Sequence, residues 1–304
     1  MTTRSRHRGR HPLRAMTAFA IMTAALGAVA SCGSEEQPVT RQSTPSASPT
    51  ATASPTTSPE DTGRVGDDVT EADLRKVAAT RVFFGHQSVG QNVLDGIPEV
   101  FTAKGVPVPP VEQDTSEPGP DGGFVSHSFI GQNEDPVSKI QAFDAAVRAG
   151  LGKKIDVAMM KFCYVDVVGG TDVDALFTAY SDTMDALGRD FPEVTFVAVT
   201  VPLTTQPGLL KKIRTGGSGG RDENVARQRL NELIRQRYTG RQLFDLAAVE
   251  STTAEGVRVA GAYKGQEYYA LHEGFASDNG HLNADGSRRA ATEWLRVVAL
   301  ASQK

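Results

Sequence analysis

Short apolar stretches alternate with longer amphipathic segments along the chain beyond residue 66. The short stretches predict strands over residues 81–85, 106–111, 155–163, 194–201 and 242–246. The longer segments, in which apolar residues recur every three or four positions, predict helices over residues 89–95, 135–149, 173–187, 222–238 and 284–301. Pro98 is expected to end the first of these helices before it, because proline lacks the amide that an interior helical position donates.

Strands that alternate with helices at this spacing predict βαβ crossovers, and hence a parallel sheet with helices on both faces. The expected fold class is therefore α/β, a three-layer α/β/α sandwich with a central parallel sheet of about five strands. The stretch over residues 155–163 is interrupted only by Asp156 and Lys161, as expected of a central strand covered on both faces. Ligands of such sheets bind at the carboxyl ends of the strands, so polar residues just after each strand are the first candidates for a site.

The first 31 residues have a different pattern. Five arginines within residues 1–14 precede a 16-residue apolar run over residues 15–30. This pattern is typical of a secretory signal, and the run is shorter than the roughly 20 residues of a membrane-spanning helix. Residues 29–32, Val-Ala-Ser-Cys, resemble the lipobox of bacterial lipoproteins, which implies that Cys32 is lipidated and becomes the new N-terminus. The alternative is an ordinary signal peptide whose cleavage site happens to precede a cysteine.

The segment after Cys32 shows no apolar periodicity. Of the 26 residues over 37–62, 20 are Ser, Thr, Pro or Ala. A segment of this composition cannot bury enough apolar surface to fold, and it is expected to form an extended tether. The sequence thus predicts a lipoprotein signal peptide at 1–31, a lipidated cysteine with a disordered tether at 32–65, and one folded domain at 66–304.

Charge and cysteine content narrow the range of partners. Five of the 32 basic residues lie in the signal segment, so the rest of the chain carries 27 Lys and Arg against 36 Asp and Glu, a net charge of −9. This balance disfavours nucleic acid as a partner, because phosphate backbones attract basic surfaces. Two cysteines are too few for a cysteine-based zinc site, and no His-Glu-x-x-His or EF-hand spacing occurs. Neither a metal nor another cofactor is expected.

The first predicted strand is followed by a serine in a tight turn. Residues 85–90 read Gly-His-Gln-Ser-Val-Gly, which places Ser88 at the start of a helix between two glycines. A hydroxyl there could act as a nucleophile, with backbone amides of the helix N-terminus holding a developing oxyanion. The alternative is structural, because Ser88 and Gln91 also match a capping box, in which the hydroxyl only satisfies backbone amides.

A second polar turn directly precedes the last predicted helix. Residues 277–286 read Ser-Asp-Asn-Gly-His-Leu-Asn-Ala-Asp-Gly, with Asp278 and His281 three positions apart. A carboxylate on one imidazole nitrogen fixes the tautomer and stabilises the cation, while the other nitrogen takes a serine proton. The alternative is a polar loop in which Asn283 or Asp285 merely caps the helix.

The early Gly-x-x-Ser and the late Asp-x-x-His, taken together, resemble the GDSL/SGNH hydrolase superfamily. The resemblance extends over the whole folded domain and is most specific in residues 281–286, His-Leu-Asn-Ala-Asp-Gly. It implies a flavodoxin-like three-layer fold and a Ser-Asp-His triad that acts on esters of lipids and acylated sugars. Carried over to this sequence, the resemblance makes Ser88 the nucleophile, His281 the general base and Asp278 the residue that orients the base.

The sequence departs from the superfamily at two motifs. Residues 85–88 are one position longer than the usual Gly-Asp-Ser, and the usual Gly-x-Asn-Asp after the central strand is replaced by residues 161–166, Lys-Phe-Cys-Tyr-Val-Asp. The superfamily also has a glycine whose amide binds the oxyanion, and Gly131 is the candidate for it. For the missing asparagine donor, the chemical candidates are Asn133 and Lys161.

Two other nucleophiles are disfavoured on physical grounds. His127 and Ser128 are adjacent, but neighbours in an extended segment point to opposite faces and cannot bond to each other. Cys163, at the end of a buried strand, could use His281 as its base, although buried cysteines are usually small apolar fillers.

These observations predict an exported serine esterase, lipid-anchored on the extracellular face of a bacterial cell membrane. It is expected to act as a monomer on a small-molecule or glycan ester through an acyl-enzyme. A cell-envelope acyltransferase that uses the same residues, and a carbohydrate-binding protein that keeps the fold without catalysis, are the alternatives.

Overall fold

The computed structural model describes residues 68–115, 119–208 and 219–303. The predicted signal peptide, Cys32 and the predicted tether lie outside the described residues. Among the helices of these three ranges, none has the length and apolar content needed to cross a membrane.

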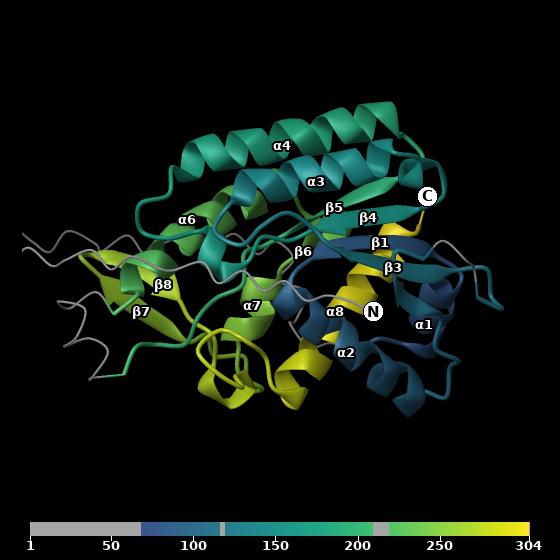
Figure 1. The fold of residues 1–304 in the computed structure, drawn as a ribbon. Coiled ribbons are helices and arrows are strands. Elements are labelled where there is room, and N and C mark those ends of the chain that lie inside the picture. The colour runs from purple at the N-terminus through teal and green to yellow at the C-terminus, as the bar shows by residue number, and fades with distance from the viewer. Residues whose placement is uncertain (1–67, 116–118, 209–218, 304) are drawn as a thin grey trace, which may run out of the picture. The chain divides into compact units, whose positions relative to one another are not determined.

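Within the described residues, a six-stranded parallel sheet forms the centre of the domain, in the order β2-β3-β1-β4-β5-β6 (Figure 1). Its strands are β1 (Arg81–His86), β2 (Val111–Gln113), β3 (Phe124–Phe129), β4 (Val157–Met160), β5 (Thr195–Val199) and β6 (Leu243–Phe244). Apart from the short edge strand β2, this is the strand order of flavodoxin-like sheets. In that order the direction of winding reverses between β1 and β4, which is where such sheets bind their ligands.

Helices cover both faces of the sheet (Figure 1). One face is covered by α3 (Pro136–Arg148), α4 (Val173–Asp190) and α6 (Arg221–Arg237), and the other by α1 (Glu71–Ala78), α2 (Ser88–Ala103), α7 (Leu246–Ser251) and α8 (Ala284–Ala301). Neighbouring residues of β1 divide between the two cores, since Phe83 stacks on Phe143 of α3 and Phe84 packs against Trp294 of α8. The predicted three-layer α/β/α sandwich around a parallel sheet is confirmed.

Helix α2 continues through Pro98 to Ala103, so the prediction that it ends before the proline is wrong. The residues on either side of the proline explain the difference, because Ile97 and Phe101 are fully buried against the core that α8 shares. Burying such side chains contributes roughly 1.5–3 kcal/mol each. Two of them offset the roughly 3 kcal/mol that proline costs inside a helix.

The sequence pattern missed strand β3, which lies between β2 and β1. Three consecutive polar residues, over 126–128, conceal it, although Phe124 and Val125 at its start are fully buried. The strand predicted over residues 106–111 is also misplaced, since β2 begins only at Val111. Ser126 and His127 are buried on opposite faces of β3, and His127 is satisfied there by its hydrogen bond to His86.

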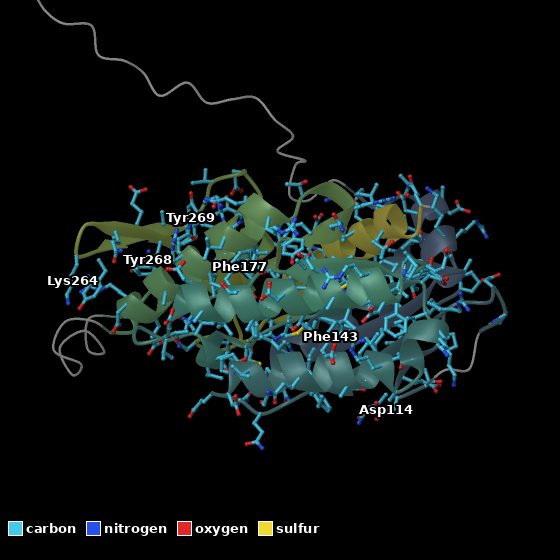
Figure 2. The ribbon with its side chains drawn as sticks, turned by 90° about the horizontal axis from the view of Figure 1, so that it is seen from above. Asp114, Phe143, Phe177, Lys264, Tyr268 and Tyr269 are labelled. Carbon is cyan, nitrogen blue, oxygen red and sulfur yellow. The ribbon has the colours of Figure 1, made fainter. Side chains whose placement is uncertain are left out.

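An antiparallel hairpin of β7 (Ala260–Tyr263) and β8 (Gln266–Tyr269) projects from the domain (Figure 1). Viewed from above, its turn at Lys264 lies on the side of the molecule away from Asp114 (Figure 2). The chain leaving the hairpin returns to the sheet at Leu271, whose amide donates to the carbonyl oxygen of Thr204, 3.1 Å away. This return leads the chain into the polar turn that precedes α8.

Candidate active site

Ser88 is the first residue of α2 and follows the carboxyl end of β1. Its side chain is exposed, and its hydroxyl oxygen lies 2.9 Å from Nε2 of His281. The capping-box alternative is not realised, because Gln87 is the N-cap residue and the Gln91 side chain donates to Asp95 instead. The serine hydroxyl is therefore directed toward an imidazole rather than toward backbone amides.

His281 is held by the aspartate three residues before it. Its Nδ1 lies 2.7 Å from Oδ2 of Asp278, while Oδ1 of Asp278 accepts the amides of Gly280 and His281 at 2.8 and 2.9 Å. These bonds, that from the Gly280 amide first, lower the pKa of Asp278 to about 2, so the carboxylate is ionised at neutral pH. An ionised carboxylate only accepts, so Nδ1 carries the proton and Nε2 presents its lone pair to the serine hydroxyl.

Tyr164, just after β4, packs against this turn. Its ring stands edge-on to the His281 ring, with 5.7 Å between centroids. A Cβ atom on residue 280 would come within 2.5 Å of the Tyr164 ring, so only glycine lets the turn lie this close. Arg227 of α6 fixes the tyrosine backbone by donating from Nε to its carbonyl oxygen at 2.8 Å.

Two further hydrogen bonds anchor the turn to the ends of other elements. Asn92, one helical turn beyond Ser88 on α2, accepts the amide of Leu282 at 3.1 Å. Thr205, after β5, donates its amide to the carbonyl oxygen of Asn279 at 2.9 Å. The histidine turn is thus attached to the segments that follow β1, β4 and β5, which meet at one end of the sheet.

Two buried histidines lie beneath the serine turn. Nδ1 of His86 lies 2.7 Å from the carbonyl oxygen of Gln87, and Nε2 of His86 lies 3.0 Å from Nδ1 of His127. Because a carbonyl oxygen only accepts hydrogen bonds, Nδ1 of His86 carries the proton. Nε2 of His86 therefore accepts a hydrogen bond that Nδ1 of His127 donates. Burial lowers the pKa of His86 to about 3 and also lowers that of His127, so both rings are neutral at pH 7.

The His86–His127 pair also fixes the direction of the Ser88 amide. In a trans peptide the C=O and the N–H point in opposite directions. The Gln87 carbonyl is held by His86 and by the amide of Gln91, at 3.2 Å. The Ser88 amide therefore points away from His86, and as a first-turn amide of α2 it has no acceptor within the helix.

The two candidate oxyanion residues lie on the loop after β3. Gly131 has a φ of 58°, and a Cβ atom there would come within 2.6 Å of the backbone nitrogen of Lys139. Asn133 is exposed and accepts the buried Lys139 ammonium on Oδ1 at 3.0 Å. Lys161, the other candidate donor, is fully buried and donates to the carbonyl oxygen of Phe162 at 3.1 Å, so it does not reach the surface.

A cavity of about 410 Å³ lies between this loop and the histidine turn. Its lining includes Glu134 and Pro136 from the loop, Tyr164 and Val168 from the segment after β4, and Asn279 from the turn. Glu134 is the neighbour of Asn133, and Asn279 stands between Asp278 and His281. The cavity is therefore bordered by the histidine turn, through Asn279, and by the loop that carries Asn133, through Glu134.

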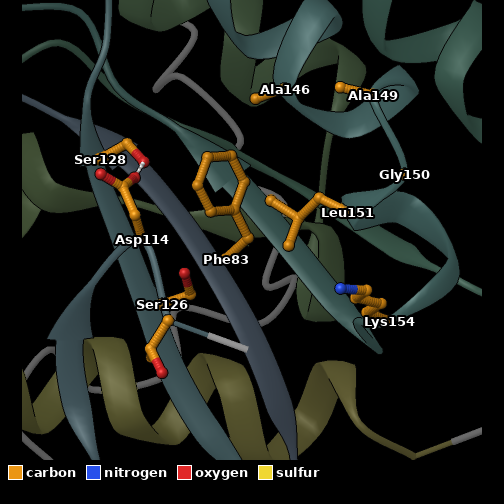
Figure 3. A pocket seen from close by; sticks show the side chains of 10 residues that line it. Phe83, Asp114, Ser126, Ser128, Ala146, Ala149, Gly150, Leu151 and Lys154 are labelled. Carbon is orange, nitrogen blue, oxygen red and sulfur yellow. Dashed lines mark hydrogen bonds between the residues drawn. The ribbon is translucent and has the colours of Figure 1, made fainter. Parts of the chain in front are cut away.

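A second cavity, of about 290 Å³, shares no lining residue with the first (Figure 3). Ser128 and Asp114 lie on its wall, and the Ser128 hydroxyl donates to the Asp114 carboxylate. His127 is on the opposite face of β3, bonded to His86. The adjacent histidine and serine therefore do not form a base–nucleophile pair.

The thiol alternative finds no support in the contacts of Cys163. This residue is buried, and its sulfur lies 3.8 Å from Nζ of Lys161. Both ring nitrogens of His281 are engaged elsewhere, with Asp278 and Ser88. Among the described residues, no group of three His, Cys, Asp or Glu side chains could hold a metal ion.

Three residues that shape the site were not singled out from the sequence. Tyr164 and Asn92 had positional signals, since one directly follows the central strand and the other lies four residues beyond Ser88, on the same helix face. Lys139 had a stronger signal, because it occupies the buried face of α3 beside Ile140 and Phe143, where lysine is rarely found.

The chain matches no protein-family model and no curated protein sequence. Solved structures with some likeness to it include a protein provisionally named as lipolytic, of the G-D-S-L family, from Desulfitobacterium hafniense. It is 10% identical, and the match covers 72% of this chain and 99% of that chain, with a TM-score of 0.37. A protein from Streptococcus pneumoniae, provisionally named as a platelet activating factor, is 12% identical over 75% of this chain and 90% of that one, with a TM-score of 0.37.

A third structure, provisionally named as an SGNH hydrolase from Slackia heliotrinireducens, is 13% identical over 71% of this chain and 96% of that one, with a TM-score of 0.38. The G-D-S-L and SGNH names are those of the superfamily that the serine and histidine motifs resemble. The fold is established by the sheet order and the helix layers described above.

Proposed function

We propose that this protein is a serine hydrolase that cleaves an ester bond through Ser88, with His281 as general base and Asp278 as the residue that orients it. The observation that carries the proposal is the hydrogen-bonded series from Asp278 through His281 to Ser88, at 2.7 and 2.9 Å, which joins residues 193 positions apart. A serine that only caps a helix would need no hydrogen bond to an imidazole. A histidine in an ordinary polar loop would need no carboxylate on its other ring nitrogen. The site also lies beyond β1, beside the winding reversal where sheets of this order bind ligands.

In the acylation step, the Ser88 hydroxyl oxygen attacks the ester carbonyl carbon while its proton passes to Nε2 of His281. The charged carboxylate of Asp278 stabilises the imidazolium that forms. The imidazolium then returns the proton to the leaving alcohol oxygen as the carbon–oxygen bond breaks, which leaves an acyl group on Ser88. Water repeats the sequence in the second half of the reaction, with His281 again taking and returning one proton.

The negative charge on the carbonyl oxygen needs donors during both steps. The first-turn amide of Ser88, the amide of Gly131 and the NH2 group of Asn133 are the groups that we assign to this role. In this assignment Asn133 replaces the asparagine that the superfamily carries after the central strand. Loss of one such donor typically lowers kcat by about 100-fold to 1,000-fold.

The substrate class that the resemblance implies is an acylated glycan or a lipid ester. We further propose that the protein is exported and anchored through a lipid on Cys32, with the domain on the extracellular face of the membrane. The support is the pattern of residues 1–32 and the composition of residues 37–62. Substitution Cys32→Ala should move the protein from the membrane fraction to the soluble fraction, and an unchanged distribution would contradict the anchor.

The esterase proposal is tested by labelling with a fluorophosphonate, which reacts with activated serines. The unsubstituted protein and Ser128→Ala should be labelled, whereas Ser88→Ala should not. Ser128 is a matched control because its hydroxyl donates directly to an aspartate carboxylate and, among the described residues, has no imidazole partner. Equal labelling of Ser88→Ala, or no labelling of the folded unsubstituted protein, would refute the proposal.

A further inference from the structure

Lys139 is a lysine with a fully buried side chain, on the face of α3 that otherwise packs into the core. Its ammonium pairs with the equally buried carboxylate of Asp166, with 2.5 Å between Nζ and Oδ2. Removing two charges from water is costly, and apolar residues of similar volume often stabilise a core as well or better. Stability alone is therefore a weak explanation for the presence of this buried ion pair. The hydrogen bonds that the pair makes to neighbouring segments offer a second explanation.

The buried pair joins the segments that follow two strands. Asp166, after β4, accepts the amide of Glu134 on Oδ1 at 2.9 Å and the amide of Cys163 on Oδ2 at 2.6 Å. Glu134 belongs to the loop after β3 and has a φ of 68°, a left-handed conformation that is unfavourable for a non-glycine residue. The hydrogen bond to Asp166 holds the loop in this unfavourable backbone geometry.

Lys139 contacts both residues of this loop that we assign to the oxyanion. The backbone of Gly131 packs so closely on Lys139 that a Cβ atom would lie 2.6 Å from its nitrogen and 2.7 Å from its Cα and Cγ atoms. The contact with Asn133 is a hydrogen bond, in which Nζ of Lys139 donates to Oδ1 of Asn133 at 3.0 Å.

The direction of this last bond is decided by chemistry, because an ammonium has protons to donate and no lone pair. The oxygen of the Asn133 carboxamide must face Lys139, so its NH2 group faces away from the buried ammonium, on the exposed side of the loop. An asparagine without this partner could present either end to a substrate. The buried charge thus sets which end of the amide is available.

We infer that Lys139 is a positioning residue for the reaction proposed above, which orients the Asn133 carboxamide so that its NH2 group is available to the oxyanion. The inference depends on the proposed esterase function. It differs from that function because it assigns a residue that touches neither substrate nor nucleophile.

A double-mutant cycle tests the inference, with Lys139→Met, Asn133→Ala and the two combined. The readouts are kcat and KM for p-nitrophenyl acetate, and the rate of inactivation by a fluorophosphonate, each corrected for the folded fraction found by circular dichroism. Asn133→Ala should lower kcat about 100-fold with little change in KM, as expected for one lost oxyanion donor. Lys139→Met alone should lower kcat at least about 10-fold, yet change it less than about 2-fold when Asn133 is already alanine.

Val147→Ala is the matched control, because Val147 is a fully buried residue of the same helix, eight positions beyond Lys139 toward the end away from the loop. It should lower the Tm but leave the kcat of the folded enzyme unchanged. A Lys139→Met loss that is equally large in both Asn133 backgrounds would overturn the inference and leave a structural role. An unlabelled unsubstituted protein would instead refute the proposed function before the cycle is measured.

If Lys139→Met does not fold, Asn133→Asp provides the decision. The new carboxylate keeps an oxygen for the Lys139 ammonium but replaces the NH2 donor by a second oxygen. An unchanged Tm with a kcat loss at least as large as that of Asn133→Ala supports the inference. Full activity of Asn133→Asp overturns it.

Discussion

Two regions of this molecule each contain a serine, a histidine and an aspartate, but only one of the two arrangements can transfer a proton. The Ser88 set consists of Ser88, His281 and Asp278, and the Ser128 set consists of Ser128, His127 and Asp114. In the Ser88 set the histidine stands between the hydroxyl and the carboxylate. In the Ser128 set the hydroxyl bonds directly to the carboxylate, and the histidine lies on the other face of the strand.

The surroundings of the two histidines differ as much as their partners. His281 is 30% exposed and has an ionised carboxylate on its far nitrogen, so it can accept a proton and stabilise the charge. His127 is buried against another histidine, and burial lowers its pKa. The comparison teaches that the order of the groups and the solvation of the base make a site, rather than the presence of three residue types.

The largest difference is expected when each histidine is removed. His281→Ala should lower kcat for p-nitrophenyl acetate by about a millionfold, the size of effect seen when a triad base is lost. Fluorophosphonate labelling should fail as well, because His281 is the only acceptor that the described residues offer to the serine hydroxyl. A labelling rate in His281→Ala within about 10-fold of the unsubstituted protein would remove His281 from the mechanism.

Substitution of the two aspartates should also have different effects on kcat. Asp278→Asn keeps the shape of the turn but loses the charge that stabilises the imidazolium, so kcat should fall by about 10,000-fold. Asp114→Asn should leave kcat unchanged, because its partner Ser128 has no part in the proposed reaction. The measurement is steady-state kinetics at pH 7 and pH 9, and equal losses in the two variants would abolish the distinction between the two sets.

His127 is expected to affect kcat indirectly, through the hydrogen bond by which it orients His86. His127→Phe removes the donor that fixes the tautomer of His86, and with it one restraint on the Gln87 carbonyl and the Ser88 amide. One lost hydrogen bond of ordinary strength corresponds to a kcat lower by about 10-fold, with KM nearly unchanged. A variant with the same kcat and the same Tm as the unsubstituted protein would show that the histidine pair does not support the serine turn.

The smallest effect on activity is expected at Glu250 of α7, whose substitution acts on stability. Oε2 of Glu250 accepts the amide of Leu203 at 2.6 Å, whereas Oε1 has no hydrogen-bond partner among the described residues. Burial raises the pKa of this carboxyl group to about 8 from 4.5. Its contribution to stability is therefore fully present below about pH 4.5 and is lost as the pH rises to about 8, because only the unfolded chain ionises in that window.

Glu250→Gln is expected to remove that part of the pH dependence. Urea unfolding at pH 5 and at pH 8 measures it, with the free energy of unfolding falling less between the two values in Glu250→Gln than in the unsubstituted protein. An equal fall in both proteins would mean that Glu250 is already ionised in the folded state at pH 5.

The elements with strong local signals were predicted closely. The last helix begins and ends where expected, at Ala284 and Ala301, because a long apolar period runs through it and Asn283 accepts the Gly286 amide as its cap at 3.0 Å. Strand β3 and the continuation of α2 past Pro98 were not predicted. Both depend on burial against distant elements, which outweighs three polar residues in one case and a proline in the other.

The candidate site divides in the same way. Ser88, Asp278 and His281 stand in short motifs whose chemistry and spacing can be read locally, and the Asp278–His281 bond itself spans only three residues. The support of the loop after β3 was not predicted, because the contacts of Lys139 with Asn133 and Asp166 depend on how α3 packs against the loops after β3 and β4.

The sequence by itself determined the alternation of strands and helices, the caps and tight turns, and the residue types present at the ends of the strands. These properties depend on hydrogen bonds and periodicities within a few positions along the chain. Only the tertiary structure decided which hydroxyl meets which imidazole, since Ser88 and His281 come together through the crossovers of the sheet, and the Ser128 side chain is separated from His127 by the strand that carries both. Proton transfer requires contact and direction, and both are set by packing.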